Sequence, residues 1–92
     1  MRLRWTEPAA HDLIRICDYI EAQNGPTAAR RVAITIHDGI SSLTDFPKRG
    51  RLGKKINTRE LVITRLPYLV VYRLREDTIE VLRILHGAQR WP

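Results

Sequence analysis

The side chains best suited to chemistry lie in the second half of the chain, where arginines alternate with apolar residues. His86 is the only histidine of that half, and a histidine can take up or release a proton near neutral pH. Arg65 and Arg83 could hold a phosphate through paired N–H donors and stabilise a pentacoordinate phosphate. If the fold brings these three residues together, they would form a site for phosphodiester cleavage. The alternative is that the arginines are solvated charges at a sheet edge, which deter aggregation.

A second group of basic residues could form a binding surface. Lys54 and Lys55 lie in a segment with glycines, and Arg59 and Arg73 lie in the apolar stretches that follow. Arg59 and Arg65 would share one face of a strand, because side chains two apart point the same way. For the two lysines, solvation without a partner is the favoured alternative.

The aromatic and metal-binding residue types give weaker signals. Trp91, one residue from the C-terminus, must either pack back onto the sheet or contact a partner, whereas Trp5 is expected in the core. His11 and His37 fall on separate predicted helices without carboxylate–histidine ligand spacing. We therefore expect neither a metal site nor a cofactor.

The elements that position these residues begin with an alternating stretch at residues 2–5, which suits a short strand. Thr6 can cap a following helix. The apolar stripe of that helix consists of Ala10, Leu13, Cys17 and Ile20, with Ile14 and Ile16 widening it. Asn24-Gly25 ends this helix, and a second amphipathic helix follows and ends before Pro47.

Three β-branched stretches fill most of the second half, at residues 58–65, 68–75 and 78–85, after a loop at 47–57. In the last of them, alternation would place Ile79, Val81, Arg83 and Leu85 on one face. The predicted fold is a single α+β domain spanning 1–92. In it, a two-helix antiparallel hairpin packs on a small twisted antiparallel β-sheet, in the order β-α-α-β-β-β.

The charge of the chain is unevenly distributed. The net charge is +6, and counting side chains gives −1 for residues 1–46 and +7 for residues 47–92. This asymmetry favours a polyanion or an acidic protein segment as partner of the second half. With 28% charged residues and one cysteine, Cys17, the sequence favours a cytoplasmic protein without a membrane span or internal disulfide.

Several motifs together resemble the RelE/ParE superfamily of toxins from type II toxin–antitoxin modules. The similarity covers nearly the whole chain and is carried by Trp5, Ala9, Asp12, Leu13 and Ile16, by Pro47 and Gly50-Arg51, by Arg59-Glu60-Leu61, by the run Pro67-Tyr68-Leu69-Val70-Val71-Tyr72-Arg73, and by the run Val81-Leu82-Arg83-Ile84-Leu85-His86-Gly87. The resemblance implies a growth inhibitor of the kind that stabilises plasmids. It also implies a cognate antitoxin, whose acidic or amphipathic segment wraps the toxin, and operator DNA bound only through that antitoxin.

The superfamily divides by target. RNA-cutting members typically carry an arginine just before the Leu-Val-Tyr of the third strand, and here the segment reads Tyr68-Leu69-Val70-Val71-Tyr72. The usual C-terminal catalytic tyrosine has no counterpart after His86. The resemblance is therefore closer to the ParE branch and implies a non-enzymatic poison of DNA gyrase.

Two alternatives stay open. One is a ribosome-dependent mRNA endonuclease, with Arg65 and Arg83 on phosphate and His86 as acid or base. The other is a degenerate member that only binds its antitoxin and operator DNA, as a co-repressor.

Overall fold

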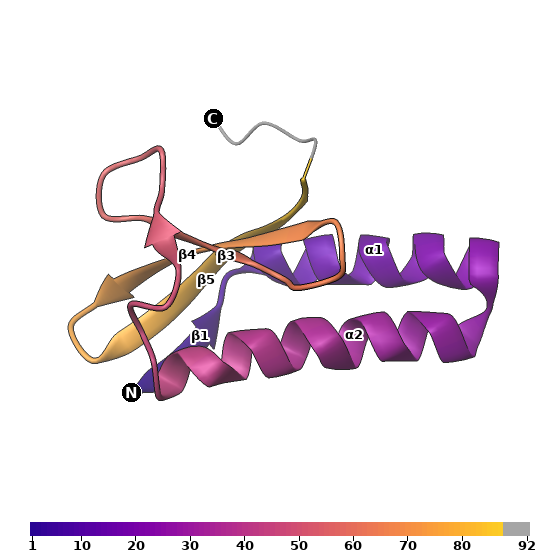
Figure 1. The fold of residues 1–92 in the computed structure, drawn as a ribbon, viewed down its shortest axis with the longest axis horizontal. Coiled ribbons are helices and arrows are strands. Elements are labelled where there is room, and N and C mark those ends of the chain that lie inside the picture. Colours follow the sequence, from indigo (N-terminus) through magenta and orange to yellow (C-terminus); the bar gives the residue numbers. More distant parts are fainter. Residues whose placement is uncertain (88–92) are drawn as a thin grey trace.

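The computed structural model describes residues 1–87, and it combines one helical hairpin with one sheet (Figure 1). The two helices run antiparallel, and the turn that joins them lies far from the sheet (Figure 1). In chain order the elements are β1 (Arg2–Trp5), α1 (Glu7–Asn24), α2 (Pro26–Ser41), the 3-10 turn η1 (Ser42–Thr44), β2 (Arg51–Leu52), β3 (Arg59–Val62), β4 (Tyr68–Arg75) and β5 (Thr78–His86).

The helical hairpin follows from its local signals. Thr6 caps α1, because its hydroxyl accepts a hydrogen bond from the amide of Ala9 at 3.3 Å. Gly25, with a φ of +89°, ends α1 and precedes α2, as predicted. The predicted apolar stripe is wrong at Ile14, whose exposed fraction is 57%, since this position points away from α2 and the sheet.

The sheet has the order β1-β5-β4-β3-β2 and is mixed. The α+β class and the packing of a helical hairpin on a small sheet are confirmed, but β1 pairs with β5 in parallel, so the sheet is not wholly antiparallel. A parallel pair needs a long crossover connection, and here both helices and the other strands lie between β1 and β5. The predicted loop at 47–57 contains β2, which pairs with β3.

The core lies between the two helices and one face of the sheet. Tyr68, Val70 and Tyr72 are buried on that face of β4, since alternate residues of a strand share a face. In β5 the pattern changes, because Tyr72 pairs with Val81 while Val71 pairs with Arg83. Leu82 is thus an extra residue that forms a β-bulge. The buried face of β5 therefore continues from Ile79 and Val81 to Ile84, and the predicted shared face of Val81 and Arg83 is wrong.

The segment before β2 is fixed to the sheet by Tyr72. Its hydroxyl donates a hydrogen bond to the carbonyl of Pro47 at 2.7 Å and accepts one from the amide of Gly50 at 2.9 Å. A side chain at Gly50 would place its Cβ 2.7 Å from the Tyr72 ring, so this close approach requires glycine. Burial raises the pKa of Tyr72, which keeps the hydroxyl protonated as a donor.

Replacing Tyr72 with Phe should lower the free energy of unfolding by about 1–2 kcal/mol, because the buried Gly50 amide and the Pro47 carbonyl each lose a partner. Urea denaturation measures this change. Tyr19→Phe on the surface of α1, where the tyrosine is 63% exposed, is the matched control and should unfold like the unmodified protein. Equal stabilities for the two variants would contradict this role of the Tyr72 hydroxyl.

Candidate functional site

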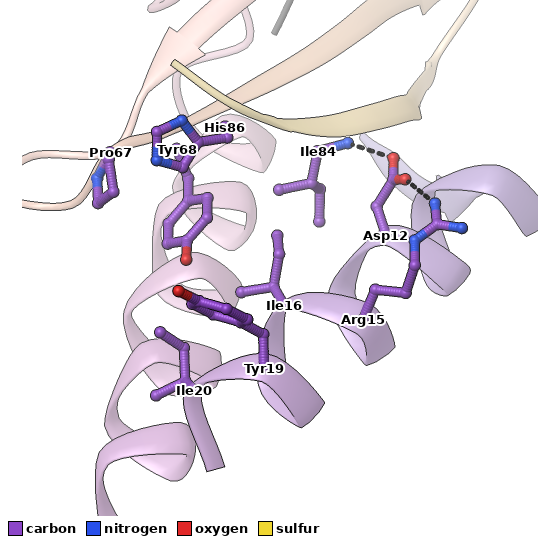
Figure 2. Close-up of a pocket in the computed structure, with 9 residues that line it drawn as sticks. All are labelled: Asp12, Arg15, Ile16, Tyr19, Ile20, Pro67, Tyr68, Ile84 and His86. Atoms are coloured by element: carbon purple, nitrogen blue, oxygen red, sulfur yellow. Dashed lines mark hydrogen bonds and ion pairs between the residues drawn. The ribbon is translucent and has the colours of Figure 1, made fainter. Parts of the chain in front are cut away.

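A groove of about 430 Å³ opens between α1 and the ends of β4 and β5 (Figure 2). Helix α1 forms one wall, and the start of β4 and the end of β5 form the other, because these strand ends are direct neighbours in the sheet. The lining combines apolar side chains with a carboxylate, a guanidinium, two phenols and an imidazole: Asp12, Arg15, Ile16, Tyr19, Ile20, Pro67, Tyr68, Ile84 and His86.

His86 and Tyr68 lie opposite each other at the sheet end of the groove. Their Cα atoms are paired across the strands, and their rings meet edge to face with centroids 5.9 Å apart. Burial raises the pKa of Tyr68, so its hydroxyl stays protonated and can donate hydrogen bonds but cannot act as a base near neutral pH. His86 is exposed at the groove and is the side chain there that is best suited to proton transfer.

Asp12 is the best-connected polar side chain of the groove and is 4% exposed. Arg83 binds both of its oxygens, with Nε 2.7 Å from Oδ2 and Nη2 3.0 Å from Oδ1. The amide of Ile84 donates to Oδ2 at 2.9 Å, and Arg15 Nη2 donates to Oδ1 at 2.8 Å. Burial alone would raise the pKa of Asp12, but these hydrogen bonds outweigh it and the pKa is lowered. The carboxylate is therefore ionised at neutral pH.

The position of Asp12 follows from the topology of the sheet. Strand β1 ends at Trp5, opposite Val81, and α1 covers the same edge of β5 from there on. Thr6 donates from its amide and its hydroxyl to the Val81 carbonyl, each at 3.0 Å. Further along the same edge, the amide of Ile84 donates to Asp12. Asp12 thus supplies the hydrogen-bond acceptor that a neighbouring strand would otherwise supply at this point of the edge. The sequence contains a signal for this role, because an acidic residue stands beside Leu13 on the apolar stripe of a predicted helix.

The three residues predicted for phosphodiester cleavage are not assembled in the groove. His86 lines it, whereas the guanidinium of Arg83 is bound by the buried carboxylate of Asp12. Arg65 lies in the turn after β3 with a φ of +69°, so its predicted shared strand face with Arg59 is wrong.

The predicted binding surface also divides into separate groups. Lys54 and Lys55 are exposed between β2 and β3. Arg59 donates to the carbonyls of Lys48 and Gly50, at 3.3 and 2.8 Å, and so holds the segment before β2. Arg73 binds Glu80. Trp91, the predicted partner contact, lies outside the described residues.

Residues 1–87 offer neither a metal-binding cluster nor a membrane-spanning helix. No cluster of histidine, cysteine, aspartate and glutamate in this part of the chain could hold a metal ion. Within the same residues, no helix has the length and apolar character needed to span a membrane.

Comparison with known proteins gives consistent results. Residues 3–91 match the family model described as ParE toxin of the type II toxin–antitoxin system parDE. The chain is 41% identical to the toxin-family protein Y4kP of Sinorhizobium fredii, over 99% of this chain and 93% of that protein. It is 39% identical to toxin RelE2 of Caulobacter vibrioides, over 92% and 93% of the two chains.

A solved structure agrees in both fold and sequence. A chain of the chromosomal ParDE toxin–antitoxin system from P. aeruginosa superposes with a TM-score of 0.88 and 30% identity, over 94% of this chain and 95% of that chain. The similarity therefore covers both the helical hairpin and the sheet.

Proposed function

The chain belongs to the ParE family of toxins from type II toxin–antitoxin systems, and we propose that it inhibits growth by binding DNA gyrase and trapping its cleaved-DNA state. In this mechanism the protein acts as a binding partner and catalyses no reaction itself. The basic segments of the second half, around Lys54 and Lys55, supply contacts.

The observation that carries this proposal is the ion pair of Arg83 and Asp12. A nuclease of this fold needs a guanidinium free to bind phosphate beside a proton-transferring side chain. Here both Asp12 oxygens bind Arg83, at 2.7 and 3.0 Å, and the same carboxylate closes the edge of β5. This pairing supports a structural role for Arg83 and, with it, the non-enzymatic mechanism.

The partner implied by family membership is an antitoxin encoded with the toxin. The +7 charge of residues 47–92 suits an acidic segment that folds as it wraps the toxin. The name of the P. aeruginosa structure, a ParDE system, supports the same pairing.

A second candidate function is ribosome-dependent mRNA cleavage. His86 and Arg15 line the same groove, so a proton-transferring group and a guanidinium that is 71% exposed do lie on one surface. The relative named RelE2 is consistent with this alternative. The site would then use Arg15 in place of Arg83.

His86→Gln separates the two functions. The unmodified protein should inhibit DNA supercoiling by purified gyrase and make cleaved DNA accumulate, and the variant should retain this within about twofold, since loss of a general acid or base costs 10²–10⁴-fold only where one is used. Both proteins are titrated against gyrase, and relaxed and cleaved DNA are scored separately.

The second arm of this experiment uses programmed ribosomes. Cleavage of mRNA by the unmodified protein, abolished in His86→Gln and accompanied by no effect on gyrase, would establish the endonuclease. A chain that inhibits neither target nor growth when expressed alone would be a co-repressor.

A further inference from the structure

A cluster of arginines occupies the face of the sheet that points away from the helices. In register across three neighbouring strands, Arg2 pairs with Thr78 and Thr78 with Arg75. Two residues further on, Arg4 pairs with Glu80 and Glu80 with Arg73. The residues between them, such as Leu3 and Ile79, pack in the core, so alternation turns this set outward. We call it the arginine face: Arg2, Arg4, Arg73, Arg75, Thr78 and Glu80.

Glu80 organises the arginine face. It is 3% exposed, and its two oxygens accept hydrogen bonds from Arg4 Nη1 and Arg73 Nε, each at 2.6 Å. Arg75 Nη1 lies 3.9 Å from the same carboxylate. The hydrogen bond from Arg73 is the main cause of the lowered pKa of Glu80, which stays ionised and fixes the guanidinium planes.

One carboxylate does not neutralise this cluster. Arg4 and Arg75 are 67% and 66% exposed, and Arg73 is 41% exposed. A guanidinium has five N–H donors, so those that bind Glu80 retain donors for a ligand. A hollow of about 260 Å³ lies on this face, lined by Arg4, Arg75, Glu76, Thr78 and Glu80. Even with Glu76 at its end, the arginines of this surface outnumber its carboxylates.

We propose that the arginine face binds the phosphate backbone of duplex DNA directly. Positions two apart on a strand are separated by about 6.6 Å, and neighbouring strands by about 4.8 Å, so the four arginines form two ranks. Such ranks can clamp successive phosphates through bidentate hydrogen bonds. The face is a strand surface without an aromatic member, and stacking platforms are what single-stranded nucleic acid requires, so duplex is the better fit.

We assign this duplex to the DNA segment that gyrase holds, and this assignment alone rests on the proposed function. Binding itself is measurable without gyrase. The arginine face is also distinct from the groove, because it lies on the opposite side of the sheet and shares no residue with the groove.

The test uses the purified full-length protein and a fluorescent mixed-sequence DNA duplex, with binding followed by anisotropy at several salt concentrations. Arg2→Gln/Arg75→Gln removes two charges while leaving the hydrogen bonds to Glu80 intact. The control, Arg30→Gln/Arg31→Gln, removes two charges from exposed positions of α2. The first variant should bind the duplex about tenfold more weakly, and the slope of log K against log salt concentration should be smaller in magnitude by about 2. The control should change neither the affinity nor the slope appreciably.

Three outcomes would overturn the inference. The first is that the unmodified protein fails to bind the duplex. The second is that both variants bind the duplex equally weakly. The third is that Arg2→Gln/Arg75→Gln keeps its DNA affinity but binds a poly-glutamate peptide or single-stranded RNA more weakly. Thermal melting is measured to check that both variants are folded. If the first variant loses DNA binding while gyrase is never inhibited by any form of the protein, the arginine face stands and the proposed function fails.

Discussion

Replacing Asp12 with Ala should destabilise the protein by about 3 kcal/mol, the largest effect we expect from one substitution. The change leaves the buried amide of Ile84 without an acceptor and removes the partner of Arg83, and breaking a buried pair costs about 3–5 kcal/mol. The lower end applies because Arg83 is 30% exposed and can be hydrated. For a domain of this size the melting temperature should fall by about 12–24 °C, measured by circular dichroism or calorimetry.

The matched control is Asp18→Ala, an exposed aspartate on the same helix, which should melt close to the unmodified protein. The pKa of Asp12 is lowered in the folded state. Its contribution to stability is therefore fully present above the ordinary carboxyl pKa, and it is lost as the pH falls through the pKa of Asp12 in the folded protein. Asp12→Ala should therefore lose less stability than the unmodified protein on acidification. Similar melting of the two variants at neutral pH would contradict the role of Asp12 at the edge of β5.

The predicted fold succeeded where local signals decide the outcome. Thr6 and Gly25 mark the helix boundaries through capping and a left-handed backbone, and both are visible in the sequence. The parallel pairing of β1 with β5 depends on contacts between residues 76 positions apart, such as Arg4 and Glu80. Periodicity cannot reveal it.

The predicted placement of the site residues differs from the structure mainly at Arg83. Strict alternation placed Arg83 with Val81, but the bulge at Leu82 shifts the core face from odd to even positions. Bulges redirect side chains, and this one accompanies the turn of Arg83 toward Asp12. A single extra residue thus accompanies the ion pair of Arg83 with Asp12, and no sequence period signals it.

The same strand connects the two surfaces of the protein. In its first half β5 contributes Glu80, which gathers the arginines on the outer face. In its second half it contributes Ile84 and His86 to the groove on the helix side. The two ion-pair centres, Glu80 and Asp12, are both buried carboxylates that hold arginines in fixed positions. Two guanidiniums share the carboxylate of Asp12, and three lie within 4 Å of that of Glu80.

Replacing Arg83 with Gln should lower the free energy of unfolding by about 2 kcal/mol, because Asp12 loses two charge-assisted hydrogen bonds while keeping those from Ile84 and Arg15. Relative to Asp12→Ala, the double variant Asp12→Ala/Arg83→Gln should lose at most about 1 kcal/mol more of its free energy of unfolding. The reason is that the shared interaction can be lost only once. Urea denaturation of the four proteins closes this double-mutant cycle. Additive losses would show that the pair is not coupled.

This cycle also decides how a toxicity result at Arg83 is interpreted. In cells, a destabilised Arg83→Gln variant inhibits growth less simply because less of it is folded. The informative measurement is therefore gyrase inhibition per folded molecule, at a temperature where denaturation shows the variant to be fully folded. Full gyrase inhibition by the folded variant would mean that Arg83 serves to hold Asp12 against the edge of β5. A folded variant without activity would mean that Arg83 leaves Asp12 to contact the target, and the phosphate-binding role would return.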